Sequence, residues 1–168
     1  TAGLVAQPGL PACGLVRTRC LRDGTPLVEA GSRRCLPEDL AAADLVLVMT
    51  RRQEGEAARL LLDARRKVFP LVRAVALAES AASQRWHTDS LEEWATILDD
   101  SRGRVPLPHP VRRERAGWSR HSQDVHPVDI PDGHTSGTAV GHEHALDLVA
   151  AQVQRLVTAW QRTFQIDA

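Results

Sequence analysis

Two residues near the start of the chain, Cys13 and Arg19, have the types and the spacing of a phosphate-handling pair. They lie six apart in the stretch ACGLVRTRC, residues 12–20. In a C-x5-R loop the cysteine thiolate attacks phosphorus and the arginine guanidinium holds the phosphate oxygens. Such a loop needs an apolar strand ahead of it, small residues whose N–H groups converge, and a helix N-terminus behind it.

The surroundings of Cys13 favour a helix instead. Turn chemistry, QPGLP at residues 7–11, precedes it, and bulky leucine and valine follow Gly14. A proline near the first turn and Gly24 past the end predict a helix over residues 11–22. A two-residue pattern without its context is a weak signal, so we interpret the C-x5-R match as a coincidence.

The other candidate ligands and nucleophiles are also interpreted as structural. Cys20 and Cys35 have no arginine six residues on and are expected to be buried or half-buried thiols. Five histidines fall in one span: His121, His126, His134, His142 and His144. Residues two apart on a helix point in different directions, and the chain has no H-E-x-x-H and no paired C-x-x-C. We expect solvated loop and helix-start histidines, no metal site and no cofactor.

Composition sets the broad class. At 168 residues, the chain is expected to form a single domain over residues 1–168. Its 21 basic and 21 acidic residues balance, so neither nucleic acid nor a membrane is favoured as a partner. An odd number of cysteines indicates free thiols in a reducing compartment, which predicts a cytoplasmic protein. Lys67 is the only lysine, and such arginine-rich usage is typical of a GC-rich bacterial genome.

The elements around these residues follow from apolar patterning. The run DLVLVM at residues 44–49 predicts a central parallel strand that is covered on both faces. Ahead of it, Pro37 suits the first position of a short helix, because acids follow it in the first turn. Residues 51–62 are predicted to form a helix, and residues 67–71 a second strand. This strand, helix, strand order is the βαβ unit of a parallel α/β sheet.

Further helices are predicted at residues 71–83 and 90–99, and a long helix closes the chain. The closing helix has an apolar stripe that must face the sheet or another helix: Leu146, Val149, Val153, Leu156, Trp160 and Phe164. In the helix after the first strand, Ala57, Leu60 and Leu61 are expected to point inward.

Between these helices lies a proline-rich segment that we interpret as a long loop, residues 103–131. Its basic residues surround a single aromatic, Trp118, and include Arg102 just before it. The stretch could touch RNA or phosphate, but a lone aromatic and an undefined surface favour a solvated loop.

Five segments, in order along the chain, resemble the low-molecular-weight protein-tyrosine phosphatases and their arsenate reductase relatives. They are TAG at residues 1–3, PGLP at 8–11, SRRCLPEDL at 32–40, ADLVLVMT at 43–50 and DIPD at 129–132. The corresponding family patterns are S-A-G-T, G-x-P, A-R-x-L with D-L, A-D-L-I-L-V-M-T, and D-(V/I)-x-D-P. The proline- and arginine-rich insertion at about residues 103–128 has no clear counterpart.

The resemblance implies an α/β fold, a short parallel sheet flanked by helices. In the family the C-x5-R loop follows the first strand and precedes the S-A-G-T stretch, so the resemblance places it before Thr1. The chain is then expected to lack the first strand and the phosphate-binding loop. Because that strand is central in the family, its absence is expected to leave unpaired strand edges and an apolar slot.

The resemblance also implies a mechanism. The thiolate forms a phosphocysteine, and an aspartic acid protonates the leaving phenolate and then deprotonates the attacking water. Asp132 occupies the matching position, with Asp129 as a structural residue or the fallback acid. Pro131, Asp132 and Gly133 are also a turn signature, and the family has proline and an aromatic where Gly133 and His134 stand.

Three functions follow in order. The first is a protein-tyrosine phosphatase, active in the complete parent and inactive as this chain alone, on a phosphotyrosine-containing protein or a small aryl phosphate. The alternative is a non-catalytic phosphatase-like binding domain. The third is an arsenate reductase, ranked last because the helix holding Cys13 and Cys20 lies elsewhere than the family's cysteine relay.

Overall fold

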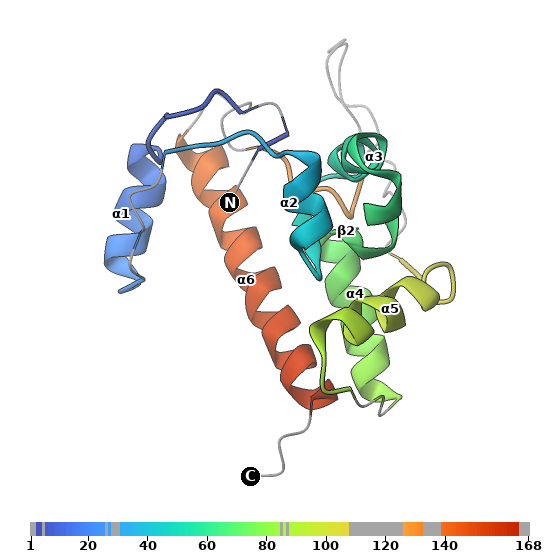
Figure 1. Ribbon diagram of the computed structural model, residues 1–168. Coiled ribbons are helices and arrows are strands. Elements are labelled where there is room, and N and C mark those ends of the chain that lie inside the picture. Colours follow the sequence, from blue (N-terminus) through green and yellow to red (C-terminus); the bar gives the residue numbers. More distant parts are fainter. Residues whose placement is uncertain are drawn as a thin grey trace, which may run out of the picture.

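The computed structural model describes residues 3–4, 6–25, 27, 31–84, 86, 88–107, 126–132 and 139–164. These form a mostly helical α/β structure in which a small parallel sheet packs against helices (Figure 1). The elements are α1 (Gly14–Arg22), α2 (Pro37–Ala42), β1 (Val46–Val48), α3 (Arg51–Leu60), η1 (Leu62–Lys67), β2 (Val68–Pro70), α4 (Leu71–Ser83), α5 (Leu91–Asp100) and α6 (Ala139–Thr163). Every helix in the described ranges is too short or too polar to span a bilayer.

The sheet consists of two parallel strands, with Val46 opposite Val68 and Val48 opposite Pro70. With α3 between them, the strands confirm the predicted βαβ unit. All of β2 is buried, whereas all of β1 is half-buried. The prediction that the first strand is central is wrong for the described residues, because β1 has a strand partner on one edge only.

A reciprocal cap turns the chain sharply from β1 into α3. Thr50 Oγ1 accepts a hydrogen bond from the backbone N–H of Gln53 at 3.2 Å. Gln53 Oε1 accepts in return from the N–H groups of Met49, at 2.8 Å, and Thr50, at 3.2 Å. Further along α3, Ala57 is buried as predicted, but Leu60 is 38% exposed because the helix ends there and the chain turns away.

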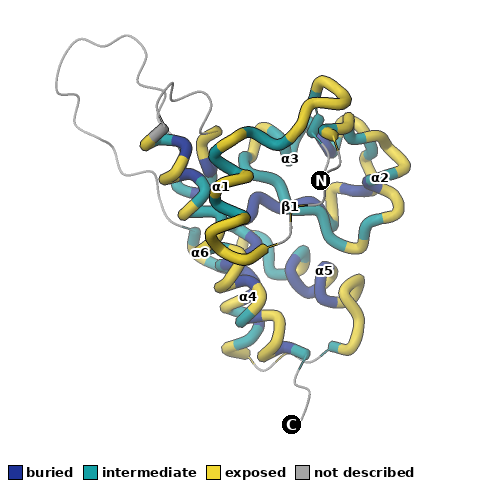
Figure 2. Tube along the Cα trace, turned by 90° about the vertical axis from the view of Figure 1, so that its left-hand side faces the viewer, coloured by how far each residue is buried: buried dark blue, intermediate teal, exposed yellow. Residues whose placement is uncertain are grey.

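The main core lies where α4, α5 and β2 meet α6, and Figure 2 shows the buried residues along α5. The predicted stripe of α6 is buried only in part: Leu156 is buried and Val149 and Phe164 pack against the core, whereas Val153 and Trp160 are 42% and 38% exposed. The other buried residues of α6 lie about one position earlier on the helix surface: His142, Ala145, Ala159 and Thr163. The reason is the partner, because α4 presents small buried residues, Ala74, Ala78 and Ala81 among them, which admit a close approach of the two helices.

Arg102 is the exception to the predicted solvated basic loop. Its guanidinium donates to Glu54 Oε1 and to the carbonyl of Val68, each at 2.7 Å, and lies 4.0 Å from the ring centroid of Phe69. Arg73 holds the other oxygen of Glu54 at 2.9 Å. The Arg102 side chain therefore packs against β2, where it contacts Val68 and Phe69. The prediction for residues 108–125 lies outside the described residues.

Candidate functional site

A cavity of about 210 Å³ opens where β1 ends. Its lining comes from the turn after β1, the first turn of α3, the loop at residues 126–132 and the start of α6. The lining residues are Met49, Thr50, Gln53, Ile130, Pro131, Asp132, His142, Ala145, Leu146 and Val149. In parallel α/β sheets, ligands bind beyond the carboxyl ends of the strands, and this cavity occupies that position.

The loop that carries Asp132 is anchored to β1 and α3. The N–H of Ile130 donates to the carbonyl of Met49 at 2.8 Å, so the loop continues along the end of the strand. Asp129 Oδ1 accepts from the backbone N–H of Arg51 at 2.7 Å, and its Oδ2 lies 3.3 Å from the Arg51 guanidinium. The carboxylate of Asp129 therefore satisfies one of the free N–H groups at the start of α3.

The two aspartates predicted from sequence have different surroundings. Asp132 is exposed and lines the cavity, together with Thr50 and Gln53. Asp129 is 18% exposed at its side chain, is committed to Arg51 and does not line the cavity. Of the two carboxylates, Asp132 is thus the one placed to meet a molecule in the cavity.

A histidine, His126, begins this loop. His126 Nδ1 accepts from the N–H of Val128 at 3.3 Å. Burial, followed by the nearby Arg51 charge, lowers the pKa of His126 below its usual range, although Asp129 opposes the shift. The neutral imidazole is therefore favoured where it supports the loop.

The C-x5-R pair does not form a phosphate-binding loop. The predicted helix is confirmed, but it begins at Gly14 rather than at Pro11, so Cys13 is the residue before it and Arg19 lies within it. The Arg19 guanidinium donates to the carboxylates of Asp23 and Asp147, and the hydrogen bond to Asp147 contributes most to the raised pKa of Arg19. With its guanidinium held by two carboxylates, Arg19 is not folded over Cys13.

The structure brings together a pair that the sequence analysis missed. Cys13 Sγ lies 3.7 Å from His142 Nε2, although the two residues are 129 positions apart. His142 is 8% exposed, so the prediction of a solvated histidine is wrong there: the packing of α6 buries it. His144 is exposed, as predicted. The available signal was the three-and-four spacing of His142 with Ala145 and Val149, which extends the buried stripe back to the first turn.

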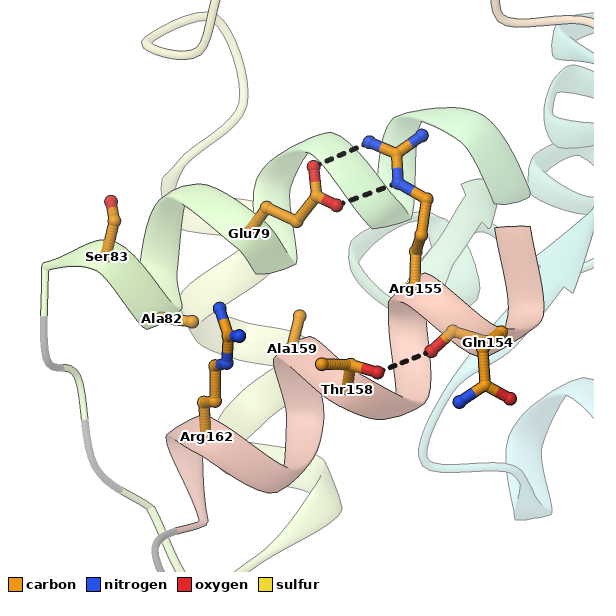
Figure 3. Close-up of a pocket in the computed structure, with 8 residues that line it drawn as sticks. All are labelled: Glu79, Ala82, Ser83, Gln154, Arg155, Thr158, Ala159 and Arg162. Atoms are coloured by element: carbon orange, nitrogen blue, oxygen red, sulfur yellow. Dashed lines mark hydrogen bonds and ion pairs between the residues drawn. The ribbon is translucent and has the colours of Figure 1, made fainter. Parts of the chain in front are cut away.

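Two other features lie apart from this site. The described residues contain no group of three or more His, Cys, Asp or Glu side chains that could hold a metal ion. A second cavity, of about 320 Å³, lies between α4 and the later part of α6 (Figure 3). Across it, the Arg155 guanidinium makes two hydrogen bonds to the Glu79 carboxylate, at 2.8 and 2.7 Å. Its remaining lining includes Ala82, Ala159 and two hydroxyls, those of Ser83 and Thr158, which donate to the backbone carbonyls of Ser80 and Gln154.

Comparison of the chain with protein-family models, with curated proteins and with solved structures found no match.

Proposed function

We propose that the chain supplies the scaffold and the proton donor of a low-molecular-weight protein-tyrosine phosphatase. The substrate is a phosphotyrosine-containing protein or a small aryl phosphate, hydrolysed through a phosphocysteine. The observation that carries the proposal is the position of Asp132, on a cavity beyond the carboxyl end of β1. The order of the resembling segments along the chain supports the same assignment.

Asp132 is the proton donor in this proposal, and Asp129 is its support. A general acid must reach the leaving oxygen, and Asp132 lines the cavity while Asp129 faces away from it into α3. The bond from Ile130 to Met49 and the Asp129–Arg51 contact fix the loop from two sides. A carboxyl group on a fixed loop is positioned without a further ordering cost when substrate binds.

The nucleophile must come from elsewhere than Cys13, since Arg19 is held by Asp23 and Asp147. The proposal requires a C-x5-R loop, which the family pattern places ahead of the segment at residues 1–3, launched by an apolar strand. The half-buried β1, with one strand partner among the described residues, is compatible with a further strand on its other edge.

The test uses the complete gene product, including any polypeptide encoded ahead of Thr1, with phenyl phosphate and 4-nitrophenyl phosphate as substrates. We predict that Asp132→Asn lowers kcat/KM for phenyl phosphate by about 10² or more, and kcat/KM for 4-nitrophenyl phosphate, whose phenol is more acidic, by clearly less. Proton donation matters most for the poorer leaving group, so this difference identifies a general acid.

Two further variants complete the experiment. Asp129→Ala is the matched control and is expected to lower stability by about 1 kcal/mol, as a lost helix cap does, without changing the leaving-group dependence. Cys13→Ser is expected to leave hydrolysis intact. Loss of hydrolysis in Cys13→Ser would contradict the proposed nucleophile, and absence of hydrolysis from the complete product would favour a non-catalytic binding domain.

A further inference from the structure

Cys13 and His142 bring a thiol and an imidazole to within hydrogen-bonding distance, 3.7 Å between Sγ and Nε2. The thiol is half-buried and therefore accessible, while the imidazole is 8% exposed and held by the packing of α6. A nucleophile beside a fixed base is the arrangement that activates cysteine. His142 also lines the cavity at the end of β1.

Two helices point their N-termini at this pair. Cys13 is the residue before α1, and His142 lies in the first turn of α6. The contacts Cys13–His142 and Arg19–Asp147 progress along both helices in the same sense, so α1 and α6 run parallel (Figure 1). Both positive helix ends therefore lie at the thiol.

We propose that Cys13 is a reactive thiol that hydroperoxides oxidise, with His142 as the proton acceptor. The Sγ–H proton passes to His142 Nε2, and the thiolate sulfur attacks one oxygen of hydrogen peroxide. An S–O bond forms as the O–O bond breaks, and the departing hydroxide takes the imidazolium proton to become water. Sulfur loses two electrons and becomes a sulfenic acid, while the peroxide is reduced to water. The proposal does not depend on the proposed phosphatase function, although His142 and Asp132 line the same cavity.

The other two cysteines do not share this setting. Cys35 has its pKa raised, by burial first and then by the charge of Asp39, so its thiolate is disfavoured. Cys20 lies two turns further along α1, about 10 Å from Cys13 at helical rise, beyond the Cα separation that a disulfide spans. A sulfenic acid at Cys13 is therefore not converted to a disulfide within α1. A low-mass thiol is the reductant expected to restore it.

The experiment compares the three cysteines within one folded chain. Limiting iodoacetamide at neutral pH is followed by mass spectrometry of the peptides that contain Cys13, Cys20 and Cys35. We expect Cys13 to react roughly tenfold faster than either of the others. A second arm adds hydrogen peroxide and dimedone, and a dimedone adduct is expected at Cys13 and to be absent from Cys13→Ser.

Variants on α6 distinguish the contribution of the His142 imidazole to the reactivity of Cys13 from the contribution of the two helix N-termini. His142→Gln is expected to lower both alkylation and dimedone labelling at Cys13 severalfold. His144→Gln, at an exposed position two residues further along α6, is expected to leave both unchanged. Far-ultraviolet circular dichroism checks that each variant is folded. Equal rates at the three cysteines of the unaltered chain overturn the proposal, as does a folded His142→Gln chain with undiminished labelling.

Discussion

Glu54 is a charged residue whose loss is expected to lower the stability of the fold. Its side chain is 16% exposed and pairs with both Arg73 and Arg102, at 2.9 and 2.7 Å. Neutralising it leaves two partly buried guanidinium groups without their common partner. We predict that Glu54→Gln lowers the free energy of unfolding by about 2 kcal/mol, below the range for fully buried pairs because water still reaches this network.

Urea unfolding measures this effect against a matched control on the same helix. Glu56→Gln breaks only the pair with Arg52, whose side chain is 83% exposed, and should cost about 0.5 kcal/mol or less. Equal costs for the two variants would show that Glu54 is no more important than a surface charge.

His126 gives the stability a pH dependence of known sign. Its folded-state pKa lies below the ordinary value of 6.5, mainly because of burial and then the Arg51 charge. Between the two pKa values the unfolded chain binds more protons, so the free energy of unfolding falls as pH drops below about 6.5. We predict that His126→Gln flattens this part of the profile and that His144→Gln does not. Thermal unfolding between pH 7 and pH 5 is the measurement, and an unchanged slope in His126→Gln would contradict it.

At the scale of elements, the contact between α4 and α6 depends on small residues. Ala159 is 3% exposed and faces an α4 surface that includes the fully buried Ala78. We predict that Ala159→Leu lowers the free energy of unfolding by about 1–3 kcal/mol, because the extra volume forces the helices apart. Ala151→Leu, at an exposed position of α6, should stay within about 0.5 kcal/mol. Denaturant titration compares them, and an equal or reversed order of costs would contradict a close contact of α4 with α6 at Ala159.

The same contact shows where local patterns succeed and where they fail. Pro37 and the apolar run at residues 44–49 located α2 and β1 correctly, because their causes lie within a few residues. The buried face of α6 was displaced because hydrophobic periodicity gives most weight to Val153 and Trp160, whereas Ala145 and Ala159 make the contact. Alanine contributes little to a hydrophobic periodicity, so its role in a helix contact becomes apparent only when the neighbouring helix is known.

For the whole molecule, the uneven burial of the two strands predicts uneven stability. Val68 and Phe69 are fully buried, whereas Val46 and Leu47 are half-buried with one strand partner among the described residues. We predict that amide hydrogens of β2 exchange more slowly than those of β1 by at least tenfold. Hydrogen exchange followed by mass spectrometry or NMR measures this, and equal protection of both strands would contradict it.

The site shows the limit of prediction from sequence at this scale. Asp132 could be proposed from the order of motifs, and its place on the cavity is consistent with that proposal. The pairing of Cys13 with His142 could not, because it depends on how α1 docks against α6 over 129 positions of chain. The local C-x5-R pattern instead relates Cys13 to Arg19, but in the fold the Arg19 guanidinium binds the carboxylate of Asp147.

The docking of α1 has a consequence for how the protein responds to its medium. This helix has no buried residue, and its Arg19 is shared between Asp23 on its own side and Asp147 on α6. The ion pair between Arg19 and Asp147 joins α1 to α6, and ions in solution screen such a pair while leaving the alanine-lined contacts untouched. Rising ionic strength should therefore release the amino-terminal helix first, and with it uncouple the thiol from its imidazole while the rest of the core stays folded.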